Sequence, residues 1–255
     1  MKEPNTPYSK TLSNMHIVHK AYLGAFLRTQ PLTKHFLIDL DSDALQPLAP
    51  TEAYRTVIIR SLFDNNLIEP AQKLQNDDSH LYALCIAGTG EKKKEILMEL
   101  MYPQADSQTA ADKTILHHLL THIQYHEAIE YMRYTLEAFH LSTFDADERF
   151  KIFFTRILED YSLAELFNTI YHSIKELAVH TMKNPDASVQ VSHFIYKGIS
   201  DRYEKAKFNN LALDSFHRPA KLPQTELSKI VSNDMLCLGD SAFYRCSSKN
   251  FSEGR

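Results

Sequence analysis

Histidines follow one face of a predicted helix in the middle of the chain. Of the 13 histidines, three are spaced four residues apart and a glutamate stands at the next step: His118, His122, His126 and Glu130. In a helix this spacing places the four side chains on adjacent turns of one face. Neutral imidazoles on neighbouring turns can share a zinc ion or another divalent ion, and a carboxylate can complete the site. The sequence therefore indicates a candidate metal centre at His118, His122 and Glu130.

A metal centre there would serve a hydrolase, because a bound ion lowers the pKa of its water toward neutrality. From His118 to Glu130 a helix rises about 18 Å, so only two neighbouring turns can share one ion. The other ligands would come from a second helix, where His172 and Glu176 are the candidates. The zinc-protease pattern His-Glu-x-x-His is not met, because His126 is followed by Glu-Ala-Ile-Glu. The alternative is that these histidines border an apolar stripe as half-buried polar residues.

A run of lysines at the start of another predicted helix is a second candidate site. Lys92, Lys93 and Lys94 follow Gly88-Thr89-Gly90 and fall in the first helical turn. Positive charges there oppose the helix dipole, and a bound phosphate would reverse that effect. The functional interpretation is a phosphate contact, and the alternative is three solvated lysines compensated by neighbouring glutamates. The Gly-x-Gly here is not a nucleotide-binding fingerprint, because the third glycine of the dinucleotide-binding motif is missing and a Walker-type Gly-Lys-Ser/Thr is absent.

The elements that position these residues are mainly helices, because apolar residues recur at spacings of three and four. The predicted helices cover residues 11–28, 50–64, 90–102, 109–140, 145–161, 163–183, 188–207 and 225–231. A further short helix is expected after Pro31. Capping-box spacings, Asp145 with Glu148 and Ser162 with Glu165, mark two of the helix starts.

Short β-like runs interrupt the helices at two places. Residues 67–74 and 80–87 flank a turn-rich stretch and are expected to form a hairpin. Near the end of the chain, residues 235–238 and 242–246 are expected to form another hairpin around Gly239-Asp240.

The first hundred residues combine a characteristic order of elements with two short motifs. The expected order is helix, short helix, turn, third helix, two-stranded hairpin and closing helix. The stretches 49–55 and 62–68 look like the two ends of a recognition helix that leads into a wing. Residues 82–88 are similar to the return strand of such a wing, except that Cys85 stands where a threonine is usual. Over about residues 11–102 the chain thus resembles the winged helix-turn-helix superfamily.

The resemblance implies that the third helix enters the major groove of DNA and that the wing touches phosphates. It implies that four residues of this helix face the duplex: Thr51, Arg55, Thr56 and Arg60. They fall on the side away from Tyr54, Val57 and Leu62, which we expect to pack in the core. Together with Lys92, Lys93 and Lys94 these four residues make up the predicted nucleic-acid-binding set.

An alternative follows from other residues on the same side of that helix. Ile59, Phe63 and Glu52 share it, and two large apolar residues with a carboxylate suit a groove reader poorly. A winged helix used for docking to a protein is therefore the competing interpretation.

Composition places the chain among ordinary globular proteins, with 44% hydrophobic and 24% charged residues. Its six glycines disfavour nucleotide-binding α/β folds, barrels and propellers, which need more. Three scattered cysteines suit buried thiols rather than a disulfide framework or a zinc site. No apolar stretch approaches a membrane span and no signal peptide is seen, so we expect a cytoplasmic protein without a membrane partner.

The sequence as a whole predicts a mainly α protein without a cofactor. The expected parts are a winged-helix-like domain (11–102), a helical bundle (104–207), a C-terminal helix and hairpin packed on the bundle (208–247) and a frayed tail (248–255). The expected function is a nucleic-acid-binding regulator whose bundle supplies dimerisation or a signal input. The expected partners are double-stranded DNA and a second copy of the chain. A protein adaptor and a metal-dependent hydrolase are the alternatives.

Overall fold

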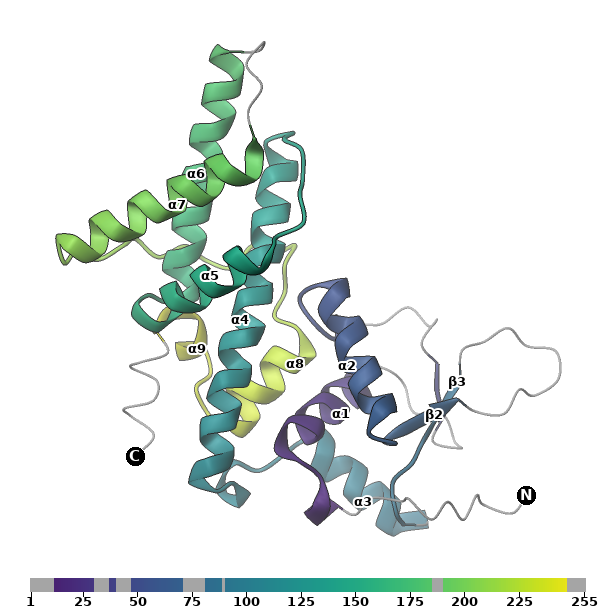
Figure 1. The fold of residues 1–255 in the computed structure, drawn as a ribbon. Helices are drawn as coiled ribbons and strands as arrows, with labels where there is room; N and C mark the ends of the chain where they lie inside the picture. Colours follow the sequence, from purple (N-terminus) through teal and green to yellow (C-terminus); the bar gives the residue numbers. More distant parts are fainter. Residues whose placement is uncertain are drawn as a thin grey trace, which may run out of the picture. The chain divides into compact units, whose positions relative to one another are not determined.

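The chain folds into two compact units (Figure 1). The computed structural model describes residues 12–29, 37–39, 47–70, 81–88, 90–184 and 190–246. Unit 1 combines Met1–Leu120 with Gln224–Cys237, and unit 2 combines Thr121–Pro223 with Leu238–Arg255. We call Gln224–Cys237 the returning segment, because the chain comes back to unit 1 there. These units differ from the expected parts, which divide the chain after residues 102 and 207.

Unit 1 contains helices and a small sheet. Its helical elements are η1 Leu12–Asn14, α1 Ile17–Thr29, α2 Glu52–Asp64, α3 Gly90–Met101, η2 Ala105–Ser107, the first part of α4 Ala110–Ala138, α8 Glu226–Lys229 and the π-helix η3 Ile230–Met235. Its strands are β1 Leu37–Asp39, β2 Ile68–Pro70 and β3 Leu81–Leu84. The mainly helical character predicted from the sequence is confirmed.

The sheet of unit 1 has three strands in the order β1-β3-β2, and both pairs are antiparallel. In the central strand β3, Tyr82 lies opposite Ile38 of β1 and Pro70 of β2. The pairing of β2 with β3 confirms the expected first hairpin, with shorter strands. Its connection, residues 71–80, falls outside the described part of the chain.

The expected short helix after Pro31 is wrong where the structure covers it, because Leu37–Asp39 form the strand β1. These residues pair with β3. The backbone hydrogen bonds of a neighbouring strand outweigh the helical spacing of a few apolar side chains. The flanking residues 30–36 and 40–46 are not among those described.

Close packing of helices builds the core of unit 1. Helix α1 packs against α2, α3 and α8, and the hydroxyl oxygens of Tyr22 in α1 and Tyr54 in α2 lie 3.3 Å apart. Gly24 lets α1 approach α3 closely, since a Cβ atom at this position would overlap the carbonyl oxygen of Leu100. Most of α1 is buried as a result.

Unit 2 is a helical bundle, as predicted. It contains the rest of α4, α5 Glu148–Asp160, α6 Leu163–Lys183, α7 Val191–Phe208 and α9 Ser241–Tyr244. Helix α6 packs against α5, α7 and α9 (Figure 1). None of the helices in the described ranges combines the length and the apolar character that crossing a bilayer requires.

The N-terminal caps in unit 2 test two of the predicted helix starts. At α6 the capping box is confirmed, because the Glu165 N–H donates to Ser162 Oγ (3.2 Å) and the Ser162 N–H donates to Glu165 Oε2 (2.7 Å). At α5 the predicted start at Asp145 is wrong. Asp147 caps the helix instead, and its carboxylate accepts hydrogen bonds from the first backbone N–H groups of α5.

Aromatic side chains fill the core of unit 2. The rings of Tyr131 in α4 and Phe167 in α6 stack with their centroids 3.9 Å apart. At the edge of this core, Asp160 Oδ2 at the end of α5 accepts hydrogen bonds from the Tyr203 hydroxyl and from Lys207 Nζ in α7, both at 2.6 Å. This triad joins the ends of two helices that bury aromatic residues between them.

The predicted C-terminal hairpin is wrong. Residues 230–235 form the π-helix η3, and Ser241–Tyr244 form the short helix α9. Cys237 and Gly239 have positive φ angles of 54° and 52° and turn the chain between these helices. The alternating pattern fails here because the apolar side chains of η3 and α9 are buried within separate units. The tail after Cys246 falls outside the described residues.

Candidate nucleic-acid interface

Thr51 sets the start of α2. Its Oγ1 atom accepts a hydrogen bond from the backbone N–H of Tyr54 at 3.2 Å, and the residue is buried. A threonine at this position satisfies a backbone donor that the helix leaves free. The structure thus gives Thr51 a capping role and places it away from the exposed face of α2.

The exposed face of α2 is a mixture of polar, charged and apolar side chains. Its members are Glu52, Ala53, Thr56, Val57, Arg60, Phe63 and Asp64. The opposite stripe of Tyr54, Ile58 and Leu62 is buried. Our expectation that Val57 packs in the core is wrong, since this residue is 54% exposed. The buried residues recur every fourth position, and this orients the helix so that Val57 faces the solvent.

Both arginines of α2 lie beside carboxylates of the same helix. Arg55 Nη1 is 2.7 Å from Glu52 Oε1, and Arg60 Nε is 3.7 Å from Asp64 Oδ2. The Arg60 side chain is 81% exposed. Exposed ion pairs contribute only about 0–1 kcal/mol, so a phosphate or a base edge can replace the carboxylate as a partner. Each carboxylate nevertheless repels a phosphate that approaches this face.

The lysines at the start of α3 point in different directions. The helix predicted to follow Gly88-Thr89-Gly90 is α3, which begins at Gly90 itself. Lys93 Nζ lies 3.5 Å from the carbonyl oxygen of Leu84 in β3, so this side chain turns back toward the sheet. Lys94 Nζ pairs with Glu91 Oε1 at 2.6 Å. Lys92 is exposed, which makes it the member of the run best placed for a phosphate contact.

The predicted metal ligands on α4 differ in exposure and in their contacts. His118 is exposed, whereas His122 and His126 are partly buried and their ring centroids lie 4.8 Å apart. Glu130 Oε2 is 3.3 Å from Arg133 Nη1. Within the described ranges, no group of three or more histidine, cysteine or acidic side chains is placed to hold a metal ion.

The two ligands expected from the second helix also have other neighbours. Glu176 forms an ion pair with Arg202 of α7. The His172 ring lies among aromatic rings, 5.5 Å from that of Tyr171 and 6.1 Å from that of Phe216, measured between centroids. These contacts explain both residues as parts of the bundle surface.

The partly buried His126 makes unit 2 sensitive to acid. Burial, reinforced by His122 and Lys151, lowers the pKa of His126 from 6.5 to about 3. The unfolded chain therefore takes up a proton that the folded chain rejects, and stability present above about pH 6.5 is lost as the pH falls toward 3. We expect the free energy of unfolding, from urea titrations followed by circular dichroism, to decrease between about pH 7 and pH 4.

A substitution at this position tests that assignment. His126→Gln removes the titrating group, so the variant should lose less stability over the same pH range. His118→Gln, which changes an exposed histidine of the same helix, is the matched control and should keep the slope of the unaltered protein. Equal slopes for all three proteins would show that His126 is not responsible.

The cysteines are less buried than expected. Among them only Cys246 is fully buried, whereas Cys85 is intermediate and Cys237 is exposed. Burial, with a further contribution from Glu69, raises the pKa of the Cys85 thiol to about 11. This thiol is therefore protonated at neutral pH, which is unfavourable for a nucleophile.

Two partly buried ion pairs join residues that are far apart in the chain. Arg28 of α1 pairs with Asp234 of the returning segment, and Arg218 Nη2 lies 3.0 Å from Glu127 Oε2 of α4. Nothing in the local sequence pattern marks these pairs, because their partners are 206 and 91 residues apart.

Comparisons with models of known protein families, with curated proteins and with solved structures found no significant match to this chain.

Proposed function

We propose that unit 1 is a winged-helix-type module that binds double-stranded nucleic acid through α2. The observation that carries this proposal is the outward face of α2. It is held in place by a buried stripe on the other side of the helix and presents Thr56 and Arg60 to the solvent. The strand order β1-β3-β2 and the turn that leads from α2 into β2 support it. The absence of the expected short helix at Leu37–Asp39 is a departure from the superfamily pattern.

The chemistry of this face fits the major groove. Ala53 is small and lets the helix backbone approach the bases, and Val57 offers an apolar contact for a thymine methyl group. Arg60, the longest exposed side chain there, can reach a guanine edge or a phosphate with paired donors. Lys92 at the start of α3 would add a phosphate contact, which positions the module without reading sequence.

Because a carboxylate lies beside Arg60, substitutions of the arginine and of the carboxylate should change duplex affinity in opposite directions. Arg60→Ala should weaken binding to a DNA duplex by about 1–3 kcal/mol. Asp64→Asn should strengthen binding roughly threefold, because it removes a charge that repels phosphate and competes for Arg60. The measurement is fluorescence anisotropy of a labelled duplex of random sequence, titrated with the full chain at several salt concentrations.

Arg149→Ala is the matched control for Arg60→Ala. Arg149 also pairs with a nearby carboxylate, Asp147 (2.7 Å), but it lies in unit 2. We expect this variant to bind like the unaltered chain. Affinity should fall steeply with salt, since phosphate contacts release bound counterions. If Arg60→Ala and Asp64→Asn leave the affinity unchanged, α2 does not face the duplex.

A protein-docking module is the second candidate, and the exposure of two apolar residues favours it. Val57 is 54% exposed and Phe63 is 47% exposed on the same helix, and exposed apolar side chains are contacts that a protein partner could cover. The same titration separates the two functions. A docking module would show no duplex affinity even at low salt, whereas a nucleic-acid module would bind most tightly there.

A further inference from the structure

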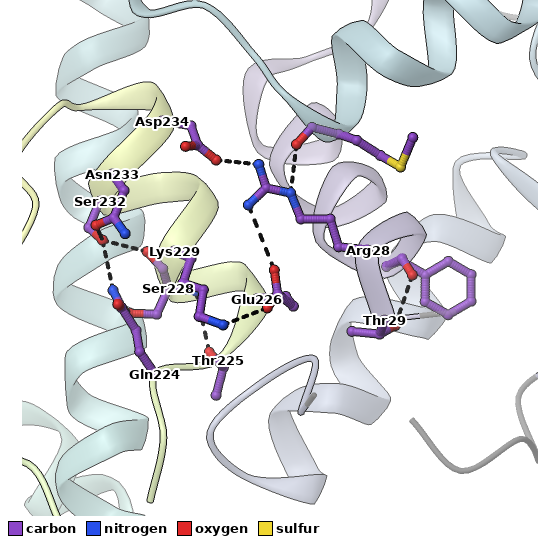
Figure 2. A network of polar contacts seen from close by, with 12 residues as sticks. Arg28, Thr29, Gln224, Thr225, Glu226, Ser228, Lys229, Ser232, Asn233 and Asp234 are labelled. Carbon is purple, nitrogen blue, oxygen red and sulfur yellow. Dashed lines mark hydrogen bonds and ion pairs between the residues drawn. The ribbon is translucent and has the colours of Figure 1, made fainter. Parts of the chain in front are cut away.

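The returning segment, Gln224–Cys237, packs against α1 and contacts the residues that lead into α2. The chain on either side of this segment belongs to unit 2. Figure 2 shows its polar contacts with the end of α1. The segment is thus covalently joined to unit 2 at both of its ends, while it is folded as part of unit 1. A segment connected in this way can transmit a conformational change from one unit to the other.

Arg28, near the end of α1, holds the returning segment at two points. Its guanidinium pairs with Asp234, and its Nη1 atom lies 3.7 Å from Glu226 Oε2 (Figure 2). Its Nε–H donates to the carbonyl oxygen of Met101, the last residue of α3, at 2.6 Å. One largely buried side chain therefore joins α1, α3 and both ends of the helical part of the segment. Hydrogen bonds to a charged group are the strong ones in such a setting.

The segment also contacts the residues that lead into α2. The backbone N–H groups of Glu226 and Leu227 donate to the carbonyl oxygens of Pro47 and Leu48 at 3.0 and 3.2 Å. These N–H groups belong to the first turn of α8 and have no partner within that helix. Thr51, which caps α2, follows shortly after Leu48. The returning segment thus helps to fix the position at which α2 begins.

The interior of the segment is a π-helix held by its surroundings. Ile230 and Val231 are fully buried, and Gly24 of α1 lies against Ile230. The buried Ser232 hydroxyl is 2.7 Å from the Ser228 carbonyl oxygen and accepts a hydrogen bond from Gln224 Nε2 at 3.0 Å (Figure 2). A π-helix is rare and is frequently found at functional sites. Its persistence here depends on tertiary contacts, so loss of those contacts would release the segment.

We propose that the returning segment is a regulatory clamp on α2, whose contacts within unit 1 determine how α2 is presented. Clamped, the segment fixes the start of α2 relative to α1 and α3. Released, it leaves α2 without the backbone contacts at Pro47 and Leu48. The consequence for duplex affinity rests on the proposed function, but the coupling between the segment and α2 does not.

Hydrogen exchange of the full chain tests the clamp directly. Asp234→Asn and Glu226→Gln each remove one charge that pairs with Arg28, and Glu226→Gln also removes the partner of Lys229. Glu91→Gln is the control for loss of a charge alone, because it removes an exposed carboxylate that pairs with Lys94 on α3. We expect amides within 55–62 of α2 to exchange roughly tenfold faster in the double variant, together with those of residues 226–236, and to be unchanged in the control. Faster exchange confined to residues 226–236 would overturn the proposal.

A second variant covers the case in which the double variant unfolds unit 1, which faster exchange throughout α1 and α3 would reveal. Asp234→Asn alone is mild, because the Asp234 side chain is 31% exposed and its amide oxygen can still accept from Arg28. In that variant a smaller increase should still appear in α2 and in the segment together. An increase in the segment without one in α2 counts against the clamp here too.

Duplex binding then separates the clamp from the proposed function. If the clamp variants loosen α2 and the unaltered chain binds no duplex, the clamp stands and the nucleic-acid function fails. If the chain binds a duplex and the variants change neither α2 exchange nor affinity, the clamp fails and the function stands. If both hold, bound duplex should slow exchange in residues 226–236, because coupling between two sites is reciprocal.

Discussion

Arg218→Ala should destabilise unit 2 by about 3 kcal/mol, near the lower end of the range for breaking a buried ion pair. Glu127, its partner on α4, has a side chain that is only 4% exposed. Its Oε1 atom is buried without a hydrogen-bond partner in the described part of the chain, so Arg218 at Oε2 is its main compensation. The Arg218 guanidinium also lies 4.8 Å from the centre of the Phe243 ring. Truncation would leave a buried charge alone and remove this contact with α9.

Urea unfolding followed by circular dichroism measures the loss of stability in Arg218→Ala, and two further variants identify its cause. Arg149→Ala, at an exposed pair of unit 2, should cost no more than about 1 kcal/mol. Adding Glu127→Gln to Arg218→Ala removes the stranded charge, so the double variant should be more stable than Arg218→Ala alone. A double variant that is less stable than the single one would show that the buried charge is not the cause.

Gly24→Ala should destabilise unit 1 by about 3 kcal/mol, because the added methyl group has no space. It would overlap the carbonyl oxygen of Leu100 and lie 3.1 Å from the carbonyl carbon and 3.2 Å from Ile230 Cδ1. Two of these atoms belong to the backbone of α3, which cannot move aside without separating α1 from α3. The gain of about 1 kcal/mol in helix propensity from glycine to alanine is too small to offset this clash.

Gly198→Ala provides the matched control in another helix. A Cβ atom at Gly198 of α7 would meet Ser173 Oγ at 3.1 Å and Ser173 Cβ at 3.2 Å. Rotation about χ1 can move the Ser173 Oγ atom, and the Cβ contact requires the neighbouring residue to shift by only a few tenths of an ångström. Propensity and clash should therefore nearly cancel, within about 1 kcal/mol. Thermal unfolding with hydrogen exchange in α3 and α6 as local probes distinguishes the two variants. Equal effects would mean that backbone crowding at Gly24 is not the deciding factor.

The two substitutions should differ in their effect on the proposed clamp. Gly24 lies where α1 meets α3 and the returning segment, so its replacement should also loosen residues 226–236 in hydrogen exchange. Arg218 lies in unit 2, so its replacement should leave the α2 amides unchanged while unit 2 stays folded. A change in α2 caused by Arg218→Ala without unfolding would show that a further route connects the units.

The sequence by itself determined the elements whose signals are local. The spacing of apolar residues predicted the helices, and the Ser162–Glu165 capping box placed the start of α6 correctly. The turn-rich stretch between residues 67–74 and 80–87 predicted the pairing of β2 with β3. These features depend on backbone donors, side-chain periodicity and turn chemistry within a few residues of one another, which a single sequence contains in full.

The tertiary structure alone decided the rest. It paired Leu37–Asp39 with β3, turned Val57 to the solvent and replaced the expected C-terminal hairpin with η3 and α9. It gave Thr51 a capping role and joined Arg28 to the returning segment, 206 residues away along the chain. Such outcomes depend on which distant surface buries an apolar side chain or satisfies a charge. Local periodicity records that a residue is apolar, but not which element covers it.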